Sequence, residues 1–144
     1  MDSVLLRCRS CGSVNRVLAK KLADRPRCGR CGAVISFPDR AADVTARTFQ
    51  KEVLSEPGTV LVEFWSPTCQ HCLRLRSVTD ELAREMAGTV KFTRVNIAMD
   101  QQLAFQFNVR STPTLVLYRG GNKIKDLPGA VPKPQLAQWI RESL

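Results

Sequence analysis

Runs of apolar residues and turn-forming residues divide the second part of the chain into predicted strands. Residues 59–65, TVLVEFW, form a nearly continuous apolar run of β-forming residues. Such a run is typical of a strand that is covered on both faces. Residues 90–97, 114–119 and 123–127 are predicted to be strands as well, and Gly120-Gly121-Asn122 predicts a hairpin turn between the last two.

Helices are predicted between these strands. A helix is expected to begin at Cys69 after the turn at 66–68 and to end at Gly88. Its apolar residues recur at helical spacing on one side: Leu75, Val78, Leu82 and Met86. Shorter helices are expected before the first strand, at 100–107 and at 132–143. The order α-β-α-β-α-β-β-α predicts an α/β fold with a mixed central sheet and helices on both faces.

The first 36 residues contain few large apolar side chains, so they need another source of stability. Residues 37–45 are expected to be a linker that leads into the first helix, with Asp43 or Thr45 as its N-cap. We therefore expect two units, a small module at residues 1–40 and a larger domain at residues 41–144.

All six cysteines lie in C-x-x-C pairs, and two of these pairs are in the small module. Cys8, Cys11, Cys28 and Cys31 match the spacing of a structural zinc site, in which four sulfurs surround one ion at about 2.3 Å. Such a set has no open coordination position, so the ion would be structural, and its binding would supply folding energy. The alternatives are two disulfides, four inert thiols, or iron or an iron–sulfur cluster in place of zinc.

The third pair, Cys69 and Cys72, follows a predicted strand and opens a predicted helix. A sulfur at a helix N-terminus lies near free N–H groups and the positive end of the helix dipole, which favours the thiolate. The two-residue gap brings the second sulfur close enough to resolve a mixed disulfide. This pattern predicts a redox-active dithiol.

Charge and hydropathy narrow the possible partners and locations. The formal net charge is +9, and nine of the 22 Lys and Arg residues lie in residues 1–40. A basic module could bind nucleic acid, but residues 1–40 contain a single aromatic residue, Phe37, on which bases could stack. We therefore do not expect nucleic-acid binding. No apolar run suits a membrane span or a secretory signal, which favours a cytoplasmic protein without membrane contact.

Several motifs together resemble the thioredoxin family. They are Glu63-Phe-Trp65-Ser-Pro-Thr-Cys69-Gln-His-Cys72, Val95-Asn-Ile97, Ser111-Thr-Pro-Thr114 and Gly129-Ala-Val-Pro132. The N-terminal module resembles the zinc module of bacterial thioredoxin 2, so the resemblance covers nearly the whole chain. It implies a thioredoxin fold with a small zinc ribbon at its N-terminus.

The resemblance also implies roles for individual residues. Cys69 would be the attacking thiolate and Cys72 the resolving thiol. Pro113 would be a cis-proline beside the disulfide, and Thr112 would offer backbone hydrogen bonds to a bound peptide. The substrate-binding positions would include Trp65, which would pack under the active-site loop, and Gly129.

A buried acid is expected next to the dithiol. Glu63 stands in an otherwise apolar strand, so burial should raise its pKa, and it could pass a proton to Cys72. Members of the family usually have Asp here. Arg94 occupies the place of a family Lys and could form an ion pair with Glu63.

The sequence departs from the family pattern around the dithiol. Gln70-His71 replaces Gly-Pro, Thr68 replaces a tryptophan, and Ser77 replaces a helix-kinking proline. A protonated His71 next to Cys69 would stabilise the thiolate, so we expect a reduction potential above that of a typical thioredoxin.

The leading hypothesis is a cytosolic protein-disulfide reductase with a structural zinc ion. Its partners would be disulfide-containing proteins and, as the resemblance implies, thioredoxin reductase. The alternatives are a more oxidising isomerase or oxidase, favoured by His71, and a basic zinc-ribbon binding module linked to a redox domain. A zinc module that senses oxidants is a further possibility.

Overall fold

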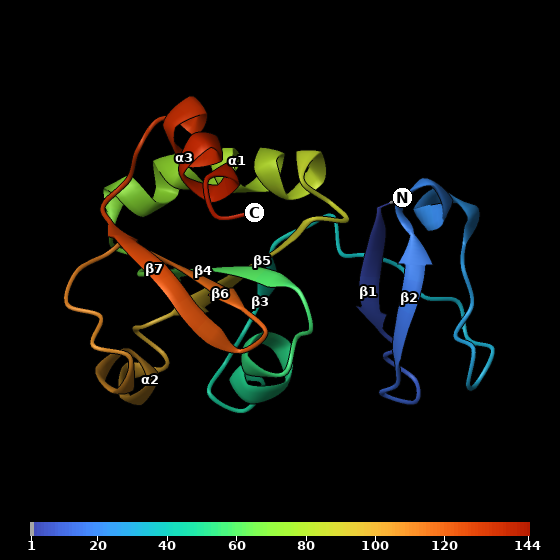
Figure 1. Cartoon of the computed structure of the whole chain (residues 1–144). Helices are drawn as coiled ribbons and strands as arrows, with labels where there is room; N and C mark the ends of the chain where they lie inside the picture. The colour runs from blue at the N-terminus through green and yellow to red at the C-terminus, as the bar shows by residue number, and fades with distance from the viewer. Residues whose placement is uncertain (1) are drawn as a thin grey trace.

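The computed structural model describes residues 2–144 and consists of a five-stranded mixed sheet with a small two-stranded unit beside it (Figure 1). The strand order of the main sheet is β3-β5-β4-β6-β7, in which β3, β5 and β4 run parallel and β6 and β7 are antiparallel to their neighbours. Its strands are β3 (Ala42–Asp43), β4 (Thr59–Trp65), β5 (Val90–Asn96), β6 (Thr114–Arg119) and β7 (Asn122–Pro128).

Helices cover both faces of this sheet, as predicted. Helices α1 (Gln70–Glu85) and α3 (Lys133–Arg141) lie on one face, and η2 (Gln50–Leu54) and α2 (Gln101–Gln106) lie on the other (Figure 1). Each side has its own apolar core. Leu82 and Ile140 belong to the core under α1 and α3, whereas Phe49 and Leu103 belong to the core on the opposite face.

The central strand β4 gives a rigid base to the turn that follows it, residues 66–69, which ends at Cys69. It pairs with β5 on one side and β6 on the other, and its residues Thr59 to Phe64 are all buried. Its apolar side chains alternate between the two cores, with Leu61 in one and Val62 in the other. The strand ends at Trp65, so the next residues emerge at the edge of a rigid sheet.

The N-terminal unit is built from β1 (Ser3–Arg7), β2 (Val14–Leu18), the 3-10 helix η1 (Ala19–Asp24) and a second hairpin bridged at Arg27 and Val34. Its small core includes two of the four cysteines and three aliphatic residues: Leu6, Cys8, Val17, Cys28 and Ile35. The cysteines therefore contribute directly to the packing, as the shortage of apolar residues suggested.

This unit lies at the end of the main sheet that is remote from the start of α1 (Figure 1). Arg7 donates a hydrogen bond of 2.6 Å to the carbonyl of Ser55. Lys91, whose side chain is 3% exposed, has its ammonium 2.7 Å from Glu52 and 3.1 Å from Glu56. Arg9 of the small unit lies 3.8 Å from Glu52, so a chain of charges links the two parts.

Three details differ from the prediction. The short strand β3 lies within the stretch expected to be a linker and contains Asp43. The first helix begins with a turn on the carbonyl of Thr45 and continues as a π-helix, and neither Asp43 nor Thr45 caps it with a side chain. Strand β7 begins at Asn122, which was expected to belong to the turn.

Within residues 2–144, no helix is both long enough and apolar enough to cross a bilayer.

Candidate functional site

Cys69 and Cys72 form a disulfide at the N-terminus of α1. Cys69 is the N-cap residue with an extended backbone, and its sulfur accepts a hydrogen bond of 3.1 Å from the N–H of Cys72. Cys69 is half-buried, whereas Cys72 is only 2% exposed. A partner can therefore reach Cys69 more easily than Cys72, and the N–H groups at the start of α1 favour negative charge on Cys69.

A loop with a cis peptide bond between Thr112 and Pro113 precedes β6. Thr114 pairs with Phe64 in the β4–β6 register. Pro113, the residue before Thr114, therefore lies beside the end of β4 that leads into the turn at residues 66–69. The N–H of Gly129 donates a 2.8 Å hydrogen bond to the carbonyl of Pro113. The structure thus brings together three of the predicted substrate-binding residues; Pro113 is buried and Thr112 and Gly129 are half-buried.

Trp65, the last residue of β4, is half-buried under a charged side chain. The guanidinium carbon of Arg76 lies 4.7 Å from the centroid of the Trp65 ring, a cation–π contact between α1 and β4. The indole nitrogen of Trp65 is buried and has no hydrogen-bond partner among residues 2–144.

Glu63 is 2% exposed in the middle of β4. Its Oε1 lies 3.5 Å from Nε of Arg94 and accepts a hydrogen bond of 3.5 Å from the hydroxyl of Thr79. Burial raises the pKa of Glu63, and the charges of Arg94 and Arg76 counteract that effect in part. The predicted direction of the pKa shift and the ion pair with Arg94 are both confirmed.

Arg94 is held by several groups of α1 that the sequence did not single out. One of its terminal nitrogens donates to Asp80 and to the hydroxyl of Thr79, each at 2.6 Å, and to the carbonyl of Arg76 at 3.1 Å. The side chain of Asp80 is 42% exposed. No hydrogen bond joins Glu63 to Cys72 within residues 2–144, so the proton-transfer role of Glu63 remains a prediction.

His71 is exposed on the first turn of α1, between the two cysteines of the disulfide. From this position, a positive charge on His71 would act on the Cys69 sulfur. Its effect on the reduction potential remains a prediction.

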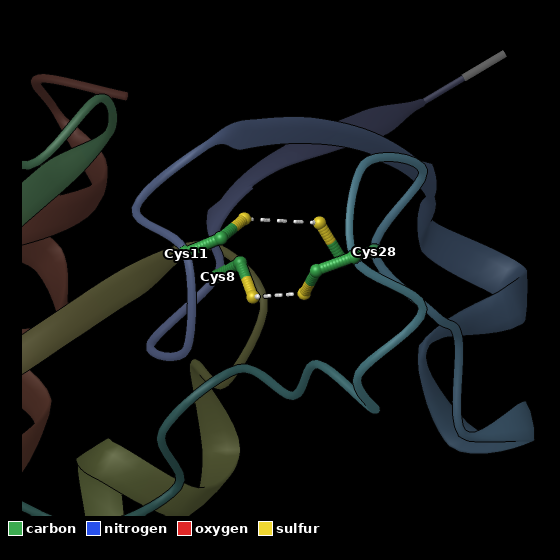
Figure 2. A group of neighbouring side chains, drawn as sticks. Cys8, Cys11 and Cys28 are labelled. Carbon is green, nitrogen blue, oxygen red and sulfur yellow. Dashed lines mark hydrogen bonds between the residues drawn. The ribbon is translucent and has the colours of Figure 1, made fainter.

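The other four cysteines form one cluster in the N-terminal unit (Figure 2). Their sulfurs all lie within 4.8 Å of one another, and two pairs, Cys8 with Cys31 and Cys11 with Cys28, are 3.6 Å apart. Four sulfurs at about 2.3 Å from one tetrahedral ion would be about 3.8 Å apart. The donor type, number and spacing therefore fit a tetrahedral metal ion.

Each C-x-x-C pair lies on a tight turn that the backbone closes in the same way. The N–H of Gly12 donates to the carbonyl of Cys8, and the N–H of Gly32 donates to the carbonyl of Cys28. Both glycines have positive φ, near 80°, a conformation that favours glycine.

Hydrogen bonds to the sulfurs of Cys11 and Cys28 favour the thiolate form that a metal requires, whereas the neighbouring cysteine sulfurs and burial raise the pKa of Cys31 to about 11. The hydroxyl of Ser13 is 3.1 Å from the sulfurs of both Cys11 and Cys28. Hydrogen bonding with Ser13 lowers the pKa of Cys11, and hydrogen bonds from Ser13, from backbone N–H groups and from Asn15 lower the pKa of Cys28 to about 5. Ser13 and Asn15 follow the first pair in the sequence, but no spacing rule singles them out.

A dithiol that caps a helix beside a cis-proline loop, on a mixed sheet of this topology, defines a thiol–disulfide oxidoreductase. The family model described as thioredoxin matches residues 40–142, and the model described as thioredoxin 2, N-terminal, a zinc ribbon, matches residues 7–33. The chain belongs to the thioredoxin family and has a thioredoxin fold with an N-terminal zinc-ribbon-like Cys cluster.

Relatives support this conclusion. The chain is 42% identical over 104 residues to Thioredoxin 1 of Nostoc sp., which covers 72% of this chain and 97% of the relative. It is 39% identical over 104 residues to Thioredoxin 1 of Synechococcus elongatus, with the same coverage. It is 40% identical over 96 residues to Thioredoxin of Haemophilus influenzae, which covers 67% of this chain and 90% of the relative.

Proposed function

We propose that the protein is a protein-disulfide reductase in which Cys69 is the nucleophile and Cys72 the resolving thiol. The Cys69 thiolate attacks one sulfur of a target disulfide; a mixed disulfide forms, and the other target sulfur leaves as a thiolate that takes up a proton. The Cys72 thiolate then attacks the sulfur of Cys69 and releases the reduced target. Two electrons pass to the target, and the protein ends with the Cys69–Cys72 disulfide.

The observation that carries this proposal is the unequal exposure of the two cysteine residues at the helix N-terminus. Cys69 is half-buried and Cys72 is 2% exposed, so a protein target meets Cys69 first. We assign Trp65, Thr112, Pro113 and Gly129 to the surface that receives the target chain. An extended chain could form backbone hydrogen bonds at Thr112.

Glu63 and His71 are assigned to tune the dithiol. Burial raises the pKa of Glu63, and its carboxyl group is assigned to exchange a proton with Cys72: the carboxylate takes the proton of the Cys72 thiol as this sulfur attacks the mixed disulfide, and the carboxyl passes a proton to the Cys72 thiolate when the Cys69–Cys72 disulfide is reduced. The exposed side chain of His71 lies on the first turn of α1, between the two cysteines, where a positive charge would stabilise the Cys69 thiolate.

Zinc is proposed as the ion of the Cys8, Cys11, Cys28 and Cys31 cluster. Four thiolate ligands at tetrahedral spacing suit Zn²⁺ and leave no position for substrate, so the ion would hold residues 1–40 in their fold. We further propose that residues 41–144 are the redox domain. Thioredoxin reductase would return the disulfide to the dithiol in the cytoplasm.

Insulin reduction tests the proposal. The wild-type protein should catalyse the reduction of insulin in the presence of dithiothreitol, and Cys69→Ser should abolish the catalysis. Cys72→Ser should accumulate a mixed disulfide with the target, because the resolving thiol is missing. Activity that survives in Cys69→Ser would contradict the assigned nucleophile.

The exposed His71 favours a second candidate, a more oxidising isomerase-like protein. The reduction potential and the refolding of a protein with scrambled disulfides separate the two. A reductase has a potential near that of thioredoxin, about −270 mV, whereas an isomerase lies near −180 mV.

A further inference from the structure

Strand β1 has a free edge that faces the main sheet. It pairs only with β2 in a two-stranded sheet, and Figure 1 shows it on the side nearer the five-stranded sheet. The N–H of Ala19 bonds to the carbonyl of Asp2, and the N–H of Cys8 bonds to the carbonyl of Ser13. In an antiparallel pair, residues turn their backbone groups toward the partner and away from it alternately.

This alternation decides which backbone groups are free. Asp2, Val4, Leu6 and Cys8 direct their N–H and C=O groups toward β2, so the intervening residues direct theirs outward. Within residues 2–144, the N–H and C=O groups of Ser3 and Leu5 have no backbone partner outside the β1–β2 pairing.

The outward edge borders a groove of about 690 Å³ between the two parts of the chain. Ser3 and Leu5 form one wall, Phe37 and Leu22 add apolar surface, and Thr59 belongs to the far wall. The contact of Arg7 with Ser55 holds β1 against the main domain beyond the groove. The volume is in the range of ligand-binding clefts.

We propose that this groove binds an extended segment of a protein substrate, which adds to β1 as a third strand. Only an extended backbone offers donors and acceptors at the spacing of Ser3 and Leu5. The lining contains Asp2, and Lys91, its single cation among residues 2–144, is already paired with Glu52 and Glu56, so the segment should be neutral or basic. This assignment of the partner rests on the proposed reductase function.

The groove and the turn at residues 66–69 lie at opposite ends of β4. Thr59 lines the groove, and Trp65 precedes the turn that bears Cys69. A strand of seven residues spans about 23 Å. A substrate held in the groove would therefore present a disulfide to Cys69 through a linker of moderate length, and its local concentration there would rise.

Titration of the protein with the peptide acetyl-Lys-Val-Thr-Val-Lys-amide, followed by amide NMR, tests the binding. The N–H signals of Ser3 and Leu5 should shift and become protected from exchange, whereas those of Val4 and Leu6 are already bonded to β2. Leu5→Pro, which removes one outward donor and leaves the ladder to β2 intact, should weaken binding at least about tenfold. Leu5→Ala, which keeps the donor, and Arg16→Pro, on the opposite edge of the ribbon, should bind almost as well as wild type.

A failure of this binding proposal can be distinguished from a failure of the reductase proposal. Cys69→Ser should bind the peptide as wild type does. A disulfide-bonded loop joined to the same peptide by a flexible linker of about 16 Gly and Ser residues should be reduced with a lower KM than the loop alone. Leu5→Pro should remove that advantage without changing kcat. No shift at Ser3 and Leu5, equal binding by Leu5→Pro, or an unchanged KM would overturn the proposal.

Discussion

Removing the charge of Arg94 should destabilise the fold in a way that depends on pH. In Arg94→Met, Glu63 loses the one cation that contacts it within residues 2–144, at 3.5 Å, and stays buried with the hydroxyl of Thr79 as its remaining partner there. Breaking a buried ion pair from one side costs about 3–5 kcal/mol. Asp80, whose side chain is 42% exposed, is resolvated and adds little to the cost.

The sign of the pH dependence follows from the pKa of Glu63. Burial raises this pKa above its ordinary value of 4.5, so the folded state binds the proton more tightly than the unfolded chain. The free energy of unfolding therefore falls as the pH rises from the unfolded pKa through the folded pKa. Without Arg94 the folded pKa rises further, so the loss of stability continues to a higher pH. At a pH at which Glu63 is protonated, Arg94→Met removes only hydrogen bonds, and this loss lowers the free energy of unfolding by about 1 kcal/mol.

Urea unfolding of four proteins at about pH 5 and about pH 8.5 measures the effect: wild type, Arg94→Met, Glu63→Gln and the double variant. Arg94→Met should lose clearly more stability at the higher pH, and the pH-dependent part should vanish in the Glu63→Gln background. An equal loss at both pH values, with or without the Glu63 carboxyl, would refute the ion pair as the source of the effect.

Three further changes have defined outcomes. Lys91→Met should lower the free energy of unfolding by about 3–5 kcal/mol, because the lysine side chain is 3% exposed between two carboxylates. The control is Lys123→Met, which breaks an ion pair with Asp126 whose two side chains are each 52% exposed. In the same urea titration it should change the free energy of unfolding by less than about 1 kcal/mol. His71→Pro should lower the reduction potential, measured against glutathione, by a part of the roughly 90 mV that separates thioredoxin from disulfide isomerase; an unchanged potential would show that His71 has no such role. Cys28→Ser should hold no metal in elemental analysis while Cys69 still reduces insulin, since the N-terminal unit that carries the four cysteines lies at the end of the main sheet remote from the start of α1; full metal content in this variant would contradict the four-cysteine site.

Local patterns were enough to predict most of the fold. Strand β4 is a continuous apolar run, and α1 has apolar residues at helical spacing, so both elements follow from the sequence itself. Strand β3 could not be predicted, because its two residues are fixed by pairing with Thr93 and Arg94 of β5 and carry no periodicity of their own. The π-helical form of the first helix could not be predicted either, because it depends on the packing of Phe49 and Val53 against the sheet.

The two sulfur sites were predictable for the same reason. A C-x-x-C spacing is local chemistry, and the family resemblance added the partner loop of Pro113. Groups that act across space were missed. Thr79 and Asp80 meet Arg94 only because α1 packs over β5, and Ser13 reaches the sulfur of Cys28 only after the two hairpins come together.

Metal analysis combined with thiol counting on the reduced, undenatured protein tests the central claim most directly. The account predicts one metal ion per chain, two thiols that react readily with an alkylating reagent, and four that react only after the metal is chelated. A metal-free protein whose six cysteines all react at the same rate would contradict it.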